Sequence, residues 1–169
     1  MLEKACGLFR LKEMDSFIAI DFETTGYETG ADNEPWQLGA VFAEDGKIVS
    51  MREWFFGTPL TPDFEPLEAH WEEIHSLLAG RNLVAHNIAT ERTILTRLAP
   101  FTKWGPWTDT LRLAKKRYPR LPSYKLGDLC ALFGAVPAPE GMLAGRTWHD
   151  GLYDAVACAL LFMKTGFSA

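Results

Sequence analysis

The sequence has few cysteines, no long hydrophobic run and fewer basic than acidic residues. Its three cysteines, Cys6, Cys130 and Cys158, are odd in number and widely spaced among 169 residues, and none forms a Cys-x-x-Cys pair. This pattern argues against both a disulfide framework and a zinc site. We therefore expect the cysteines to be core residues in a reducing compartment.

Secretory and membrane-spanning features are also missing. No apolar run approaches the ~20 residues that span a bilayer, and the N-terminus lacks the basic-then-apolar pattern of a signal peptide. We expect a cytoplasmic protein with no membrane contact. The formal net charge of -5 argues against broad coating of nucleic acid through clustered lysine and arginine. An acidic chain instead suits a carboxylate site that is completed by divalent cations.

The first half of the chain is predicted to form an antiparallel meander. Length and a hydrophobic content of 47% fit one domain over residues 1–169, with residues 1–15 as an arm of undecided structure. The run Phe17–Ile20 is apolar on both alternating faces, as in a strand covered on both sides. Strand patterns at 36–43 and 47–56 flank an Asp-Gly turn, which is a strong hairpin signal.

The second half alternates strand and helix patterns, which indicates an α/β fold with a mixed five-stranded sheet: the meander first, then parallel strands, with helices on the faces. The region 134–145, rich in proline, glycine and alanine, is expected to be a loop. Helices are expected at 67–78, 88–98, 124–133 and 152–164, and short strands at 83–85 and 108–113.

Asp21 and Glu23 stand two residues apart at the end of the first strand. Their side chains therefore leave the same face, with Cα atoms roughly 6.7 Å apart, and such a pair can chelate cations. Taken alone, the pair is better explained by a solvated turn and is weak evidence for a cation site.

Two further acids lie where apolar side chains are expected. Asp154 shares a helical stripe with Ala157, Cys158 and Leu161, and a buried carboxylate without a partner costs several kcal/mol. Glu91 lies on the side of its helix that should face the sheet. The alternative for Glu91 is an exposed ion pair with Arg92 or Arg97.

The four acids come from three separated segments and are expected to converge at one edge of the sheet. Oxygen-only ligands favour Mg²⁺ or Mn²⁺ over zinc. Two such cations, ~3.5–4 Å apart, can stabilise both the attacking water and the leaving 3′ oxygen of a phosphodiester. The sequence therefore indicates metal-dependent phosphodiester hydrolysis.

Two histidines stand at the starts of predicted helices. His149 belongs to the loop before the last helix, with Asp150 as the helix cap, and its imidazole could accept a proton from water. The alternative for His149 is a surface residue without function. His86 is expected to be structural, and Asn87 is a candidate N-cap.

These segments resemble the DEDDh exonucleases related to the proofreading subunit of bacterial DNA polymerase III, within the ribonuclease H-like superfamily. Residues 21–26 (Asp-Phe-Glu-Thr-Thr-Gly) are similar to the first motif, 83–91 to the second, and His149 with Asp154 to the third. Residues 108–111 and 124–129 resemble intervening family segments. The likeness runs from about Phe17 to Met163.

The resemblance implies a 3′→5′ exonuclease with two Mg²⁺ or Mn²⁺ ions, held by Asp21, Glu23, Glu91 and Asp154, and with His149 as general base. It also implies candidate substrate-binding residues: Phe22, Thr24, Thr25 and Asn87. The Thr24-Thr25 backbone would hold the terminal nucleotide. Phe22 is either a wedge beside the carboxylates or, from its alternation with Ile18 and Ile20, a core residue.

The chain departs from the family pattern in two places. Thr90-Glu91 stands where the family usually has Phe-Asp, so the acid is one methylene longer, which could lower activity or favour Mn²⁺. The region Leu60–Ala79 is short. Two alternatives therefore stay open: an exoribonuclease acting on short RNA or RNA 3′ ends, and a weakened enzyme that serves as a nucleic-acid-binding or scaffold protein.

The expected partner is the 3′ end of a single-stranded nucleic acid, with DNA favoured over RNA. The basic segment Lys115–Arg120, together with Lys125, either guides phosphates or is a solvated helix end. No polymerase-binding tail is evident after the last motif, which favours a stand-alone trimming enzyme.

Overall fold

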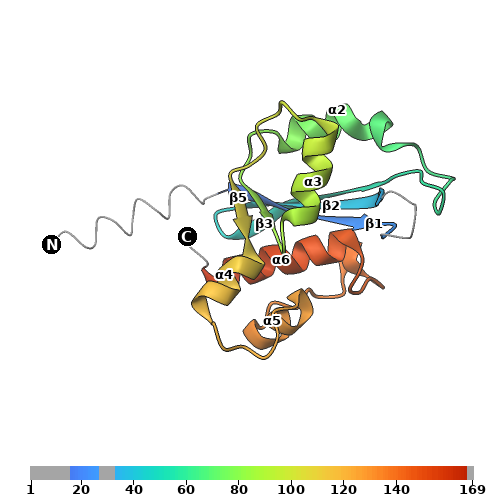
Figure 1. Ribbon diagram of the computed structural model, residues 1–169. Helices are drawn as coiled ribbons and strands as arrows, with labels where there is room; N and C mark the ends of the chain where they lie inside the picture. Colours follow the sequence, from blue (N-terminus) through green and yellow to red (C-terminus); the bar gives the residue numbers. More distant parts are fainter. Residues whose placement is uncertain (1–15, 27–32, 167–169) are drawn as a thin grey trace.

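The computed structural model describes residues 16–26 and 33–166, and the N-terminal arm and Cys6 lie outside the described residues. Figure 1 shows a five-stranded sheet with helices on both faces, and the strand order is β3-β2-β1-β4-β5. β1 is antiparallel to β2, and β2 to β3, whereas β4 and β5 continue parallel to β1. This confirms the predicted α/β fold with an antiparallel meander followed by parallel strands. The strands are β1 (Ser16–Thr24), β2 (Pro35–Glu44), β3 (Lys47–Phe55), β4 (Leu83–Ala85) and β5 (Trp107–Asp109).

Helices cover the sheet in two layers. Figure 1 shows α2 and α3 above the sheet and α4, α5 and α6 below it. The helices are α2 (Leu67–Leu78), α3 (Ala89–Leu98), α4 (Thr110–Arg117), α5 (Leu126–Phe133) and α6 (Gly151–Thr165), with a short 3-10 turn, η1 (Gly141–Leu143). Among the described residues, no helix has the length and apolarity needed to cross a membrane.

The central strand β1 divides the core into two clusters because its side chains alternate between the faces. Ile18, Ile20 and Phe22 pack in the cluster beneath α2 and α3. Phe17 and Ala19 pack in the cluster around α6, which also contains both described cysteines. Asp21 and Glu23 extend this second row, so the carboxylates leave the strand on the face that carries α6.

The prediction of a strand over residues 108–113 is wrong beyond Asp109. The Asp109 carboxylate accepts hydrogen bonds from the backbone N–H groups of Leu111 and Arg112 at 3.0 and 3.3 Å. These bonds cap α4, so the chain forms a helix from Thr110 where the sequence predicted a continuing strand. The hairpin prediction is confirmed, since Asp45 and Gly46 form the turn between β2 and β3 with φ of 49° and 73°.

The two predicted helix caps have different outcomes. Asp150 caps α6, since its side chain accepts from the N–H of Tyr153. The prediction that Asn87 caps the second-motif helix is wrong, because α3 begins one residue later, after Ile88, with no side-chain cap. Asn87 instead has a left-handed backbone with φ of 71°, which asparagine tolerates better than most residues.

Candidate active site

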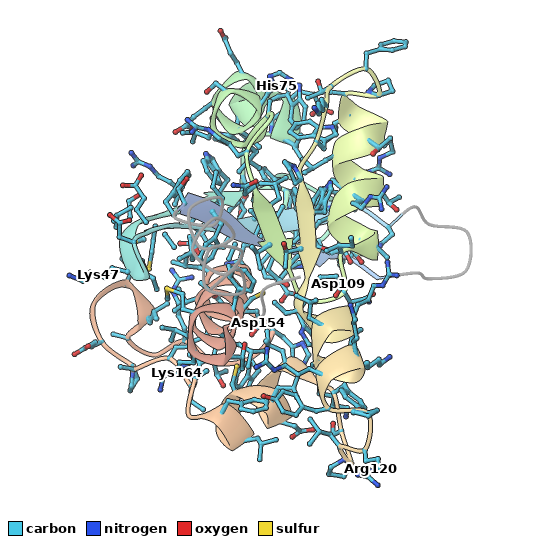
Figure 2. All side chains as sticks on the ribbon, turned by 90° about the vertical axis from the view of Figure 1, so that its left-hand side faces the viewer. Lys47, His75, Asp109, Arg120, Asp154 and Lys164 are labelled. Atoms are coloured by element: carbon cyan, nitrogen blue, oxygen red, sulfur yellow. The ribbon has the colours of Figure 1, made fainter. Side chains whose placement is uncertain are left out.

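The ends of the parallel strands bring the predicted acids to one edge of the sheet. β1 ends at Thr24, and Ala85 at the end of β4 is in register with Asp109 at the end of β5. Glu91 follows in the first turn of α3, and Asp154 lies in the first turn of α6. Figure 2 shows Asp154 on α6 and Asp109 where α4 begins.

Asp21 lies between the acids of the other two motifs. Burial raises its pKa well above the usual value, and the charges of Glu91 and Asp154 raise it further. Burial also raises the pKa of Glu23, and the charge of Asp154 adds to that rise. The structure thus brings together four carboxylates that destabilise one another in their ionised forms.

Two glycines allow α6 to dock directly on the sheet beside Asp21. Gly39 of β2 is paired with Asp21, and a Cβ at Gly39 would lie 2.2 Å from the carbonyl oxygen of Gly151. Gln37 completes the contact, because its Oε1 accepts from the N–H of Gly151 at 2.9 Å. This backbone contact places Asp154, one helical turn later, next to the carboxylates of β1.

His149 projects from the loop that precedes α6. Ligand atoms of Glu23, His149 and Asp154 all lie within 4.8 Å of one another. The His149 residue is exposed and has a left-handed backbone with φ of 69°, and its N–H donates to Asp154 Oδ2 at 3.2 Å. The histidine therefore lies at the solvent side of the cluster, where its imidazole can reach a water molecule next to the carboxylates.

Glu91 is buried, with only 3% of its surface exposed. The surface ion pair with Arg92 or Arg97 is wrong, since no salt bridge within residues 33–166 joins Glu91 to either arginine. Burial raises the pKa of Glu91 to about 7, while hydrogen bonds from its own N–H and that of Phe22 lower it. The bond from Phe22 ties the second motif directly to the first.

The carboxylate cluster fits the predicted divalent cations. Among the described residues, Glu91 Oε2 and Asp154 Oδ1 are buried without a hydrogen-bond partner. A buried carboxylate oxygen without a partner is costly, and a cation removes that cost. The carboxylate donors consist of oxygen alone, which suits hard ions such as Mg²⁺ and Mn²⁺.

The candidate substrate residues have different surroundings. The Phe22 side chain is 6% exposed and packs in the core, so it matches the core alternative and not the wedge. Thr24 and Thr25 lie at the irregular end of the β1–β2 pairing, partly buried, where β-bulges often adjoin active sites. The N–H of Thr25 donates to the Glu34 carbonyl, so a nucleotide contact through Thr25 requires another of its groups. Asn87 is exposed.

His86 has the structural surroundings that the sequence predicts for it. Its ring nitrogens contact Thr110 Oγ1 and the Tyr124 carbonyl, both at 2.9 Å. Burial lowers the pKa of His86, which favours the neutral ring. This ring joins the end of β4 to the segments around α4 and α5.

Two curated proteins are similar to this chain in sequence. The chain is 28% identical over 170 residues to a DNA polymerase III PolC-type of Halalkalibacterium halodurans. The match covers 88% of this chain and 11% of that protein. The chain is also 30% identical over 165 residues to the DNA polymerase III PolC-type of Mycoplasmopsis pulmonis. That match covers 84% of this chain and 11% of that protein. The chain therefore spans about a tenth of the length of these relatives. No protein-family model matches it.

Solved structures with a similar fold carry exonuclease names. A structure of exonuclease X in complex with 5′-overhanging duplex DNA is similar at a TM-score of 0.63 and 23% identity, over 87% of this chain and 89% of that chain. The nuclease domain of 3′hExo, a DEDDh family member, bound to rAMP is similar at a TM-score of 0.68 and 15% identity, over 89% and 91%. The chain has the DEDDh exonuclease fold. The predicted resemblance and the ribonuclease H-like architecture are confirmed.

Beside the predicted motifs, the structure contains a polar network that sequence reasoning missed. The Arg146 guanidinium donates to both carboxylate oxygens of Glu53 on β3 and to both of Asp150. Gln37 Nε2 also donates to Glu53, at 2.8 Å. The network holds the loop before α6, which carries His149, against the sheet. The four-residue spacing of Arg146 and Asp150 is a signal in the sequence for their ion pair. Glu53, the partner on β3, lies 93 residues away, so no local pattern indicates it.

Proposed function

We propose that this chain is a 3′→5′ exonuclease that hydrolyses the terminal phosphodiester bond of single-stranded nucleic acid with two Mg²⁺ or Mn²⁺ ions. The observation that carries the proposal is the cluster of four carboxylates with raised pKa values, in which two buried oxygens lack a partner. Among the described residues, no lysine or arginine forms a salt bridge with these four acids. Divalent cations are the partners that such a cluster requires.

Asp21, Glu23, Glu91 and Asp154 would hold the cations. When bound, the cations would supply positive charge that stabilises the attacking water and the leaving 3′ oxygen. The acids from β1, α3 and α6 keep their positions through backbone contacts, so the site is formed before substrate arrives. Such preorganisation reduces the reorganisation needed during the reaction.

His149 would act as the general base. A ring nitrogen of its imidazole would accept a proton from the water that attacks the terminal phosphorus. The bond between phosphorus and the 3′ oxygen would break, and the leaving oxygen would take a proton from solvent water. This step releases a nucleoside 5′-monophosphate and leaves a 3′-hydroxyl on the shortened strand. The exposed position of His149, beside Glu23 and Asp154, supports this role.

Single-stranded DNA is the proposed substrate, with RNA as the alternative. Exonuclease X is similar in fold and was solved with DNA, whereas the similar 3′hExo nuclease domain was solved with rAMP. Thr24, Thr25 and Asn87, at the edge of the carboxylate cluster, would contact the terminal nucleotide. The side chain of Phe22 has no part in this proposal because it is buried.

The proposal is tested by incubating 3′-labelled and 5′-labelled single-stranded DNA and RNA with the protein in Mg²⁺, Mn²⁺ or EDTA. We expect metal-dependent release of mononucleotides from the 3′ end. The activity should disappear in Asp21→Asn and persist in Asp63→Asn, a matched change at an exposed aspartate. Absence of cleavage with either metal would contradict the proposal and favour a nucleic-acid-binding role.

A further inference from the structure

A hollow of about 670 Å³ opens between α3 and the start of α4, next to the carboxylate edge. In Figure 2, the labelled Asp109 lies where the lower end of α3 approaches the start of α4. The lining contains three arginines and a single acid, in a chain whose formal net charge is -5. The lining residues are Asn87, Ile88, Ala89, Arg92, Thr93, Thr96, Arg97, Asp109 and Arg112.

The arginines of this hollow are not engaged elsewhere. Within the described ranges, the side chains of Arg92, Arg97 and Arg112 form no salt bridge and no hydrogen bond, and all three residues are exposed. Surface arginines commonly find a carboxylate, and this chain has more acids than bases. Three free guanidinium groups around one hollow therefore form a site for anions.

Helix periodicity explains how α3 serves two purposes. Glu91, Ile94 and Leu95 face the sheet and are buried. Arg92 and Arg97 lie on the opposite side, together with the two threonines of the lining. The same helix therefore presents a carboxylate to the cation site and guanidinium groups to the adjoining hollow.

Asp109, the acid of the lining, connects the two walls of the hollow through hydrogen bonds. Its Oδ1 accepts from the N–H groups of Asn87, Leu111 and Arg112 at 3.1, 3.0 and 3.3 Å. These bonds connect the segment that leads into α3 with the first turn of α4. The carboxylate thereby holds the two walls of the hollow at a fixed separation, and its charge is partly satisfied by three donors.

We propose that this hollow binds the backbone phosphates of the substrate strand on the 5′ side of its terminal nucleotide. The inference rests on the proposed exonuclease function, and Asn87 connects the hollow to the end of β4 at the carboxylate edge. Guanidinium groups bind phosphate oxygens through paired hydrogen bonds. The lining contains no aromatic side chain on which a base could stack, so the contact reads the backbone and tolerates any sequence.

The spacing of the arginines indicates more than one phosphate. Arg92 and Arg97 are five residues apart on α3, which corresponds to a rise of about 7.5 Å. Phosphates of a stacked strand recur about every 3.4 Å along its axis. The two guanidinium groups therefore contact different phosphates, and Arg112 approaches from α4. A dinucleotide is too short to use the hollow, whereas a longer strand gains affinity from it.

The test compares two triple variants with the same change in charge. Arg92→Gln with Arg97→Gln and Arg112→Gln removes the hollow's cations. The matched control is Lys47→Gln with Arg52→Gln and Arg81→Gln, three exposed basic residues outside the hollow and outside the segment Lys115–Arg120. Figure 2 shows Lys47 well away from Asp109 and Asp154. Binding of 5′-fluorescein-labelled 12-nucleotide oligo(dT) is followed by anisotropy in EDTA at several salt concentrations. Cleavage of a labelled thymidine dinucleotide in Mn²⁺ is measured alongside.

Each phosphate contact to a single strand contributes about 0.7 to the slope of log affinity against log salt, so loss of three contacts lowers the slope by about 2. Between 50 and 200 mM salt, wild-type affinity should therefore fall about 20-fold more than that of the hollow variant. Dinucleotide cleavage should be unchanged. An equal loss in the control variant, or an unchanged slope in the hollow variant, would overturn the inference.

The design separates this inference from the proposed function. Anisotropy requires no catalysis, so a wild-type protein that binds the 12-mer through the hollow but cleaves neither substrate supports the hollow and contradicts the exonuclease. A wild-type protein that cleaves both substrates, with no difference between the two triple variants in 12-mer affinity, supports the exonuclease and contradicts the hollow.

Discussion

Two clusters of carboxylates flank the first turn of α6, and they differ in how their charge is balanced. Glu53 and Asp150 share the guanidinium of Arg146, whose pKa rises through these hydrogen bonds. Asp21 and Asp154 have no such partner, and burial raises the pKa of both. Paired acids stabilise the fold, whereas buried unpaired acids cost stability and therefore indicate a function.

The first and largest effect expected from this comparison is on catalysis by the unpaired cluster. Asp21→Asn should lower activity by roughly 10³-fold or more, since removing a cation ligand costs several kcal/mol of transition-state stabilisation. The same substitution should raise the melting temperature in EDTA, because it removes a repelling charge. Cleavage rates and thermal denaturation check both effects, and a lower melting temperature would contradict the description of Asp21 as unpaired.

His149→Ala sharpens the comparison by separating the proton acceptor from the cation ligands. Turnover should fall by about 10²–10⁴-fold, the usual contribution of a general base. Mn²⁺ affinity should remain close to that of the wild type, because the four carboxylates are intact. Activity assays and calorimetric metal titration provide the two measurements. A parallel loss of Mn²⁺ affinity would show that His149 is a ligand and not the base.

The pH dependence of stability distinguishes the two clusters without any substrate. The pKa of Glu91 is about 7 in the folded protein and 4.5 ordinarily, so between these values the folded state binds more protons than the unfolded state. Stability in EDTA therefore falls as pH rises through this window, by on the order of 3 kcal/mol.

Urea denaturation in EDTA at pH 5 and pH 8 measures this change. Glu91→Gln should remove much of it, and the raised pKa of Asp21 acts in the same direction in both proteins. Saturating Mg²⁺ should stabilise the protein at pH 8. Stability that increases from pH 5 to pH 8 in EDTA would be inconsistent with these pKa shifts.

The paired cluster is broken by Arg146→Met. Loss of the guanidinium leaves Glu53 and Asp150 facing each other, and we expect a loss of about 2 kcal/mol, moderated by partial exposure of all three side chains. Activity should fall about tenfold through kcat, since the loop carrying His149 loses its anchor. Arg146→Lys should restore part of both. Unchanged kcat with reduced stability would limit the network to folding.

The smallest effect is expected for Glu91→Asp, at the departure from the family pattern in the second motif. Glu91→Asp should retain or raise Mg²⁺-dependent activity, within about fivefold, because an oxygen ligand and the charge both remain. Glu91→Ala should abolish most activity. Rates in Mg²⁺ and Mn²⁺ for both variants provide the measurement, and full activity in the alanine variant would exclude Glu91 from the site.

Local sequence patterns were sufficient for most of the fold and for the acids of the site. The helix over 67–78 and the strand over 83–85 were predicted with the bounds that the structure shows. The buried position of Glu91 followed from helical periodicity alone. These features depend on neighbours a few residues away, and sequence periodicity reports such neighbours directly.

Long-range contacts were not predictable in this way. The cap that Asp109 provides for α4 is local, but the strand expected over 108–113 left no place for it. The close approach of Gly39 and Gly151 requires the strand register and the docking of α6 to be known first. The hollow between α3 and α4 likewise combines segments that meet only in the folded chain.

The most direct test of the account is a calorimetric titration of Mn²⁺ into the metal-free protein and two variants, one from each cluster. Wild type and Glu53→Gln should bind up to two ions, as expected of a two-cation site, whereas Asp21→Asn should lose most of this binding. Equal Mn²⁺ binding by wild type and Asp21→Asn, or no binding by wild type, would contradict the claim that the unpaired carboxylates form a cation site.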